Sequence, residues 1–347
     1  MSDQFAAARD LLSPVRAVMY DWDASGIRSA FADAAAPDAV FQLAFPFETL
    51  GNAADFACGA LDVLERAWPD VERRDYIVMA GDDPFGATWV GCAGFYTGTF
   101  ARPFLGIPPT GHQAAMRFHE FYRVEEGRIV EMQALWDIPE VMMQAGVWPM
   151  GASLGRTWSP PAPATSDGLR TGPRDEEWSA RSASHVTGML TDMVKHPTEP
   201  EDVMRLDHWW HEKFSWYGPA GIGTARGISG FRNWHQIPFL KAMPDRRGGY
   251  RGESHFFGDG PYVGVTAWPG MSMTFTGDGW LGIPANGQPI TMRSLDFWRV
   301  EDTPNGLKIR ENWVLVDLLA VWDQFGVDVL GRMRELASAP KVAADRF

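Results

Sequence analysis

The sequence has few cysteines, a shortage of basic residues and no long apolar run, and each shortage excludes a class of protein. Two cysteines, Cys58 and Cys92, cannot build a disulfide framework in a chain of 347 residues. There are 31 basic residues against 44 acidic ones, so the net charge is −13 and the chain would repel a nucleic-acid backbone. No apolar stretch approaches the roughly 20 residues that a membrane helix needs. We therefore expect neither nucleic acid nor a membrane as a partner.

Several motifs are also missing. Residues 1–23 contain no basic segment followed by an apolar core, so we expect no secretory signal peptide and predict a cytoplasmic location. Residues 218–227 are rich in glycine but lack the Lys-Ser/Thr of a phosphate-binding loop. No Gly-x-Ser-x-Gly motif is present either. We expect no cofactor. In contrast, the 16 tryptophans and 21 phenylalanines are enough to fill a core or line an apolar pocket.

The sequence repeats itself after about 175 residues. Three pairs of segments match in order: "LGIPPTG" (105–111) and "LGIPANG" (281–287), "MRFHEFYRVEEG" (116–127) and "MRSLDFWRVEDTPNG" (292–306), "WDIPEVMMQAGV" (136–147) and "VDLLAVWDQFGV" (316–327). Ordered matches with little drift indicate a duplicated domain. We predict a first domain over residues 1–150 and a second over 178–340. Residues 151–177, rich in proline and glycine, are predicted to be a linker over the surface.

Each copy begins with helical patterns and continues with strands. Helices are predicted along the apolar stripe from Phe5 to Met19 and over residues 52–68, 176–196, 199–214 and 228–243. Strands are predicted over 86–100, 115–124 and 127–136, and over the matching segments 262–275, 291–300 and 307–316. A short helix ends each copy. Helices followed by antiparallel strands are typical of an α+β fold.

The "LGIPPTG" turn, the "FYRVEEGRI" hairpin and the terminal helix with "Q-x-G" resemble the SnoaL-like polyketide cyclase family, within the superfamily of nuclear-transport-factor-two-like proteins. The resemblance implies two tandem cone-shaped domains, each a curved, mostly antiparallel sheet wrapped by helices around an apolar pocket. It implies a polyketide or ester cyclase type of activity without metal or organic cofactor. Many single-copy relatives pair through their sheets, so the two copies are expected to form an internal pseudo-dimer, and a homodimer of whole chains is a further option.

The resemblance also identifies a departure. The family carries a histidine at the positions of Glu120 and Asp296, and a catalytic aspartate at those of Ala134 and Val314. Neither copy keeps this acid–base pair. The side chains of Asp296 and Glu120 nevertheless each lie on a strand face that is otherwise apolar or aromatic, where burial would raise a carboxyl pKa. The alternative is a carboxylate that pairs with an arginine or a backbone group.

Further candidates surround these carboxylates. Asp137 and Asp317 match between the copies, but capping of the following helix is the stronger interpretation. His208 and His211 have a spacing that can hold a metal, yet no third ligand is evident, and we expect no metal. The catalytic candidates are Asp296, His255, Asn312 and Asp317. The candidates for substrate binding are Trp216, Tyr217, His235, Trp268, Trp298 and Trp313. The candidates for a first-domain pocket are Glu120, Tyr122, Trp136 and Asp137.

Two functions remain open at this point. The first is a cofactor-independent enzyme that acts on a mid-sized apolar or polyketide-like molecule by acid–base chemistry, as a cyclase, isomerase or dehydratase. The second is a non-catalytic small-molecule binder on the same fold. In a third arrangement, one copy serves only as a built-in partner. The first copy has Ala60 and Ala80 where the second has His235 and His255, so we expect the second copy to be the working one.

Overall fold

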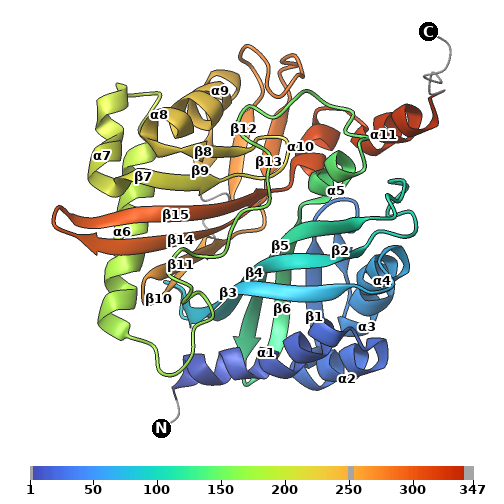
Figure 1. Cartoon of the computed structure of the whole chain (residues 1–347). Coiled ribbons are helices and arrows are strands. Elements are labelled where there is room, and N and C mark those ends of the chain that lie inside the picture. Colours follow the sequence, from blue (N-terminus) through green and yellow to red (C-terminus); the bar gives the residue numbers. More distant parts are fainter. Residues whose placement is uncertain (1–2, 249–253, 340–347) are drawn as a thin grey trace.

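The computed structural model describes residues 3–248 and 254–339, and its two halves are built alike (Figure 1). Each half contains a six-stranded curved sheet with helices packed beside it, as the sequence predicted for a duplicated α+β domain. Residue 340, the predicted end of the second domain, lies outside the described residues. No helix in the described part of the chain is long and apolar enough to cross a membrane.

The first half runs from α1 to α5. Its elements are α1 (Gln4–Asp21), α2 (Ala24–Ala34), β1 (Ala35–Leu43), β2 (Thr49–Leu50), α3 (Ala53–Phe56), a π-helical turn (Ala57–Leu61), α4 (Asp62–Ala67), β3 (Glu72–Asp82), β4 (Thr88–Thr99), β5 (Gln113–Glu125), β6 (Arg128–Trp136) and α5 (Ile138–Gln144). The sheet order is β2-β1-β6-β5-β4-β3. β1 and β6 are parallel, and the other neighbours are antiparallel.

The second half repeats this plan with interruptions. Its elements are α6 (Glu176–Met193), a 3-10 turn (Glu201–Met204), α7 (Leu206–Trp209), β7 (Trp210–Tyr217), β8 (Thr224–Arg226), α8 (Gly227–Phe231), a π-helical turn (Arg232–Gln236), α9 (Ile237–Ala242), β9 (Arg247–Gly248), β10 (His255–Asp259), β11 (Tyr262–Thr266), β12 (Met271–Thr274), β13 (Pro289–Met292), β14 (Ser294–Thr303), β15 (Gly306–Val316), α10 (Leu318–Gln324) and α11 (Val329–Ser338). The main sheet has the order β10-β11-β14-β15-β7-β8, and β13-β12-β9 form a separate small sheet.

The helical stripe of the sequence is confirmed in α1. Phe5, Leu12, Val15 and Met19 are all buried on one face of this helix, as a period of 3.6 residues requires. The side chain of Asp3 accepts a hydrogen bond from the backbone N–H of Phe5 and caps the helix. α1 packs against β3 of the first sheet.

One predicted helix is wrong. Residues 199–214 fold as a 3-10 turn and the short α7, and then enter strand β7 at Trp210. Aromatic residues explain the outcome, because Trp210, Phe214 and Trp216 alternate with other positions along a strand and are buried. His208 therefore lies on a helix and His211 on a strand, so these two residues do not have the helical spacing that suggested a metal site.

The two main sheets pack face to face. Phe121 of β5 stacks on Phe297 of β14 with ring centroids 4.8 Å apart. Beside this pair, Nδ1 of His119 lies 2.7 Å from the carbonyl oxygen of Leu295. The cluster is continuous and draws on both halves, with Tyr76, Met79 and Trp89 from one side and Tyr217, Phe257 and Trp313 from the other. The domain interface is therefore a second hydrophobic core, formed between the two sheet faces that lie opposite to the concave ones.

Two matching polar links flank this core. The Asp137 carboxylate accepts a hydrogen bond from Arg117 and another, 2.9 Å long, from the backbone N–H of Ala220. In the same way, the Asp317 carboxylate accepts bonds from Arg293 and from the backbone N–H of Phe45, at 3.1 and 3.0 Å. Each aspartate thus binds the strand end of the other domain.

The expected capping roles of these aspartates differ. Asp317 caps α10 by accepting from the N–H of Ala320 at 3.2 Å. Asp137 occupies the equivalent place before α5, but its side chain makes no cap bond and is used across the interface instead. Burial raises the pKa of both carboxyls, that of Asp317 to about 6, against the lowering effect of the neighbouring arginines.

The segment between the halves lies against both domains without helix or strand of its own. Leu169 bridges to Val78 of β3, while Arg156 bridges to Thr224 of β8. The guanidinium of Arg174 donates to the carbonyl oxygen of Gly258 and to the carboxylate of Asp82. The segment ties the two sheets together along one side of the molecule (Figure 1).

Candidate functional site

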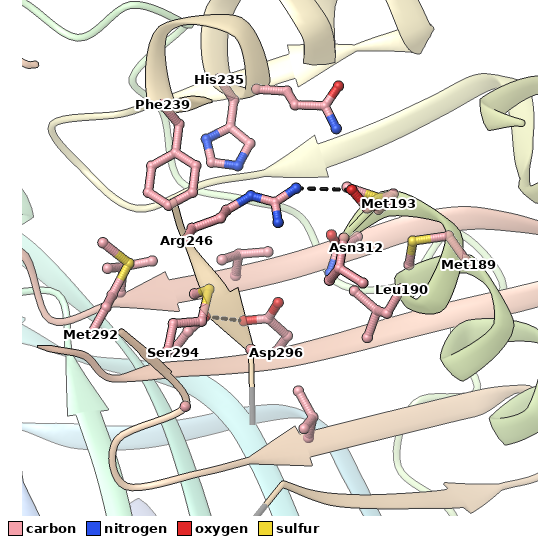
Figure 2. A pocket seen from close by; sticks show the side chains of 18 of the residues that line it. Met189, Leu190, Met193, His235, Phe239, Arg246, Met292, Ser294, Asp296 and Asn312 are labelled. Atoms are coloured by element: carbon pink, nitrogen blue, oxygen red, sulfur yellow. Dashed lines mark hydrogen bonds between the residues drawn. The ribbon is translucent and has the colours of Figure 1, made fainter. Parts of the chain in front are cut away.

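A cavity of about 710 Å³ lies in the second domain, between the concave face of its sheet and the helices α6, α8 and α9. Its walls are mostly apolar and include Met189, Leu190, Phe231, Phe239, Trp280 and Met292. A volume of this size suits a drug-sized molecule. Figure 2 shows five of the polar groups at this space: Ser294 and Asp296 from β14, Asn312 from β15, His235 from the π-helical turn and Arg246 from the loop before β9.

Strand alternation decides which candidates reach the cavity. On β14, Ser294, Asp296 and Trp298 line it, and on β15 Asn312 does so. The strands are in register, because Asp296 pairs with Val314 and Trp298 pairs with Asn312. The structure therefore brings together the predicted residues Asp296, Trp298 and Asn312 on one face of the sheet.

Asp296 is the carboxyl group of this cavity. Burial raises its pKa from 3.8 to about 7, although a hydrogen bond from Ser294 and the charge of Arg117 act in the opposite direction. The Ser294 hydroxyl donates to the Asp296 carboxylate at 2.6 Å. Within the described part of the chain, it is the only side chain that hydrogen-bonds this group. A carboxyl with such a pKa exchanges a proton at neutral pH.

His235 lines the cavity but stays neutral. Its ring stacks on Trp216 with centroids 4.0 Å apart and an interplanar angle of 16°. Burial and the neighbouring charge of Arg246 lower its pKa to about 3. His235 therefore does not relay protons near neutrality, as its residue type had suggested, and instead forms an aromatic wall with Trp216.

Arg246 supplies the positive charge of the cavity. It precedes β9, and its guanidinium donates to the carbonyl oxygens of Met193 and His196 at 3.0 and 3.4 Å. Burial lowers its pKa. Arg246 could not be predicted from the sequence, because a lone arginine in a loop carries no spacing signal. Ser294 was on the predicted strand face but was not singled out.

Four other candidates face away from this cavity. Tyr217 and Trp313 follow Trp216 and Asn312 directly in the chain, so they point to the opposite face and belong to the core between the domains. Trp268 packs against the edge of that core, with the guanidinium of Arg293 lying 4.7 Å from its ring centroid. Asp317 belongs to the interdomain link described above. The prediction that these residues share a site with Asp296 is wrong.

His255 also lies at the domain interface. Its neighbours in sequence, Ser254 and Phe256, line the cavity, so the side chain of His255 is directed toward the first domain. There its Nδ1 lies 2.5 Å from a carboxylate oxygen of Asp83, and its ring packs against Trp89. The expected pairing of His255 with Asp296 is therefore wrong, and His255 instead helps to join the domains.

The first domain fills the equivalent space with a buried cluster. Glu120 is fully buried and accepts four hydrogen bonds. The donors are Arg73 at 2.5 Å, Tyr122 at 2.6 Å, Tyr96 at 2.8 Å and the indole N–H of Trp136 at 3.1 Å. A carboxylate with all its acceptor positions occupied has a structural role. Glu120, Tyr122 and Trp136, predicted to line a pocket, are packed in the core instead, and Asp137 lies in the interdomain link.

Strand register shows which residues of the second domain occupy the positions of this cluster. Arg73 pairs with Tyr96 and Tyr96 with Met116, as Gly248 pairs with Met271 and Met271 with Met292. The four donor positions are thus occupied in the second domain by Gly248 for Arg73, Met271 for Tyr96, Trp298 for Tyr122 and Val316 for Trp136. None of these four residues donates a hydrogen bond to Asp296 in the described structure. Gly248, Met271 and Val316 are smaller than the residues at the matching positions of the first domain, so space remains beside Asp296 and its carboxyl lacks the donors that Glu120 has.

No cluster of three or more metal-ligating side chains occurs among residues 3–248 and 254–339. His211, one of the two histidines considered for a metal, accepts a hydrogen bond from the N–H of Lys213 and contacts Arg310. Besides the neutral His235, the polar side chains that line the cavity are one carboxyl, the guanidinium of Arg246 with Arg247 at the rim, two amides and several hydroxyls. The amides belong to Gln236 and Asn312, and the hydroxyls to Thr187, Thr191, Ser254 and Ser294.

Solved structures similar to this chain come from several bacteria. A protein from a Jannaschia species, provisionally named a SnoaL-like polyketide cyclase, is 19% identical over 41% of this chain and 94% of its own, with a TM-score of 0.36. IdmH from Streptomyces antibioticus, provisionally named a polyketide cyclase, is 23% identical over 40% and 98%, with a TM-score of 0.34. An NTF2-like protein from Burkholderia thailandensis is 21% identical over 42% and 98%, with a TM-score of 0.31.

The sequence comparisons are more decisive. No curated protein matches the chain. The family model of the SnoaL-like polyketide cyclases, however, matches it in two separate regions, residues 21–145 and 187–325. These two regions together span well over half of the sequence, and each contains one of the six-stranded sheets. The chain therefore belongs to the SnoaL-like polyketide cyclase family and carries the family's domain twice.

Proposed function

We propose that the second domain is a cofactor-independent enzyme that uses Asp296 to move a proton on a mid-sized apolar or polyketide-like molecule. The observation that carries this proposal is a single carboxyl with a pKa of about 7 in an apolar cavity of about 710 Å³. At neutral pH about half of such a group is ionised, so it can accept a proton and later return it.

The chemistry that fits is the abstraction of a proton beside a carbonyl group. The Asp296 carboxylate removes the proton, and the electron pair of the broken C–H bond forms an enolate. Asn312 contributes one amide N–H to the carbonyl oxygen of Phe297 at 3.0 Å and has a second N–H available to polarise the ligand. The enolate then closes a ring, shifts a double bond or expels a leaving group, which makes the enzyme a cyclase, isomerase or dehydratase.

The departure from the family's acid–base pair keeps a second function open. Val314 lines the cavity where relatives carry an aspartate, and His235 is neutral, so the cavity holds one group that titrates near pH 7. A cavity with one such group also suits a protein that binds an apolar ligand without changing it. The cytoplasmic location, the absence of a cofactor and a homodimer of whole chains stay predictions from the sequence.

We further infer that the two domains correspond to the two subunits of a dimer. The matched links through Asp137 and Asp317 support this inference, because each binds the backbone of the other domain in the same way. The apolar core between the sheets supports it as well. In this arrangement the first domain acts mainly as a stable partner.

Enolisation can be tested without the natural substrate. Aryl β-keto esters are incubated with the protein in D₂O, and the exchange of the proton between the two carbonyls is followed by NMR. We expect catalysed exchange that rises with pH through about 7, as Asp296 loses its proton. Asp296→Asn should reduce the exchange by about 10²- to 10⁴-fold.

The matched control is Asp302→Asn, which changes an exposed aspartate on the same strand outside the cavity. This variant should exchange at the wild-type rate. If the wild type catalyses no exchange of any bound keto ester, or if both variants lose it equally, Asp296 is not the general base and the binding protein is the better account.

A further inference from the structure

We propose that the cavity selects ligands that combine a planar apolar body with a carboxylate, and that Arg246 binds this anion. The inference rests on the proposed function for the presence of a ligand, and it adds the chemical class of that ligand. It is carried by the position and hydrogen bonds of Arg246 and by the aromatic walls beside it (Figure 2).

Arg246 is held in place with donors to spare. Its two hydrogen bonds, to the carbonyl oxygens of Met193 and His196, both come from the Nη2 nitrogen. A guanidinium has five N–H donors, so three remain, on Nη1 and Nε. In Figure 2 this group extends into the space between His235 and Asp296. The contact with the end of α6 therefore anchors the side chain and leaves its remaining donors available.

Arg246 is half-buried, and the fully buried arginines Arg73 and Arg299 are neutralised by carboxylates. Arg73 pairs with Asp75 and Glu120, and Arg299 pairs with Glu311. Arg246, by contrast, has no carboxylate within 4.0 Å in the described part of the chain, although burial is large enough to lower its pKa. A desolvated charge without a counter-ion is unfavourable, so an anion that enters this cavity gains a strong, charge-assisted hydrogen bond.

The repeat shows that this charge is specific to the second domain. Gly248 occupies the register position of Arg73, so Arg246 corresponds to Val71, which is buried in the first domain. In the first domain the arginine neutralises the buried glutamate. In the second, the cation lies two residues earlier and is not paired with Asp296. The guanidinium of Arg246 is therefore available to an anion that enters the cavity.

The walls define the rest of the ligand. Trp216 and His235 form a stacked pair, and Phe239 lies 5.8 Å from His235 between ring centroids. These rings, together with the apolar side chains of α6, favour a flat hydrocarbon body. With its carboxylate on Arg246, such a ligand would extend along the cavity toward Asp296.

The test uses two probes of the same shape, 2-naphthoate and neutral 2-naphthamide. Binding to the full chain is measured by calorimetry at pH 6, where naphthoate is ionised and Asp296 is still mostly protonated, and is followed by the quenching of tryptophan fluorescence. We expect the wild type to bind naphthoate about 10-fold or more tightly than naphthamide. Arg246→Met should weaken naphthoate about 10- to 100-fold and change naphthamide less than about 3-fold.

Two further variants separate the role of Arg246 from folding and from long-range charge. Arg246→Lys retains the positive charge and should recover part of the preference for naphthoate. Arg247→Met removes a neighbouring, exposed arginine at the cavity rim and should leave the preference within about 3-fold of the wild type. Circular dichroism and thermal melting of each variant confirm that it is folded.

The outcomes distinguish this proposal from the proposed enzyme. Equal affinity for the two probes in the wild type, equal loss of both in Arg246→Met, or binding of neither at millimolar concentration overturns the assignment of Arg246. A preference that depends on Arg246, with no Asp296-dependent exchange, supports the anion site and rejects the enzyme. Asp296-dependent exchange without a preference for the anion gives the reverse result.

Discussion

The two domains share one fold and differ in what occupies its concave face. In the first domain, Glu120 is surrounded by four donors and the interior is filled. In the second, Asp296 keeps one hydrogen bond, from Ser294, and faces a cavity. The same strand position thus holds a carboxylate that stabilises a core in one copy and a carboxyl that titrates near pH 7 in the other.

The strands of the first domain are also more continuous than their counterparts in the second. β3, β4 and β5 of the first domain are continuous over 11, 12 and 13 residues. Each counterpart in the second domain is divided, so that β9, β12 and β13 leave the main sheet and form a small one. Between β11 and β12 lies Pro269, which has no N–H to continue the ladder. The small sheet contributes Gly248, Met271 and Met292 to the wall of the cavity that Asp296 faces.

We infer that the first domain mainly contributes stability, while the second contains the candidate site. A half-buried carboxyl that faces an apolar cavity with few partners reduces stability, while a saturated one in a well-packed core does not. The second domain can tolerate the unfavourable group because it shares an apolar core and two polar links with the first.

The largest effects on the free energy of unfolding are expected at Arg117 and Arg293, the arginines of the two links between the domains. Arg117 is buried and donates to three backbone carbonyls, those of Tyr217, Gly218 and Val314, as well as to Asp137. Arg117→Met should lower the free energy of unfolding by about 3–5 kcal/mol, since it leaves a buried carboxylate without its cation. Arg293→Met also leaves a buried carboxylate, Asp317, without this cation. The loss should be smaller, about 2 kcal/mol, because Arg293 is 21% exposed and has no hydrogen bond to a backbone carbonyl in the described structure. Urea denaturation of both variants measures the difference, and equal losses would show that the two links are equivalent in strength.

Removal of the saturated carboxylate should also destabilise the protein. Glu120→Gln leaves Arg73 with Asp75 alone and gives Tyr96 and Tyr122 a poorer acceptor. We expect a loss of about 3 kcal/mol in unfolding free energy, at the lower end for a broken buried ion pair, because Asp75 remains. The cavity of the second domain should keep its affinity for naphthamide in this variant. A stable Glu120→Gln protein would contradict the structural role of the cluster.

Neutralisation of Asp296, the equivalent carboxyl of the second domain, should raise the free energy of unfolding instead of lowering it. The folded-state pKa of Asp296, about 7, exceeds its ordinary value of 3.8, so the folded protein holds a proton that the unfolded chain releases between these pH values. Stability contributed by this group therefore falls as the pH rises from about 4 to about 7. Asp296→Asn should raise the unfolding free energy by on the order of 2 kcal/mol at pH 8 and have little effect at pH 4. Denaturation curves at both pH values check this, and destabilisation at pH 8 would contradict it.

Replacement of Ser294 by phenylalanine, the residue at the matching position of the first domain, should fill part of the cavity with little change in the free energy of unfolding. Ser294 occupies the position of Phe118, and its strand neighbour across the ladder is Val316 in place of Trp136. Ser294→Phe should fill space above Asp296 and weaken the binding of naphthamide by about 10-fold or more, while unfolding free energy changes by about 1 kcal/mol. Ser294→Ala serves as the control, because it removes the hydroxyl without adding volume and should retain binding. Unchanged binding in Ser294→Phe would place the ligand elsewhere.

The sequence predicted the fold well because a repeat is a strong signal. Matches such as Leu105 with Leu281 established the duplication, and period-2 alternation placed Asp296 on a face with Trp298. The same alternation could have excluded Tyr217 and Trp313, since each is adjacent to a residue, Trp216 or Asn312, that lines the cavity. At these two positions, alternation along the strand indicates the lining of the cavity better than residue type does.

Other features depend on contacts between distant segments. The donors of Glu120 come from four separate strands, and no local pattern connects Arg73 with it. His255 pairs with Asp83 across the domain interface, 172 residues away in the sequence. Arg246 reaches the cavity from a loop beside the end of α6. Such long-range pairings are set by how the sheets and helices pack, which residue types and spacing do not specify.

The proposed role of Asp296 depends on its protonation, which NMR can follow in the folded protein. Aspartate carboxyl carbons are labelled with ¹³C, the Asp296 signal is identified by its absence in Asp296→Asn, and its chemical shift is followed from pH 3 to pH 9. A midpoint at about 7 is the result we expect for a carboxyl desolvated in an otherwise apolar cavity. A midpoint near 4, the value of an exposed aspartate, would contradict the account, because Asp296 would then be a solvated carboxylate and the second domain would have no proton-transferring group at neutral pH.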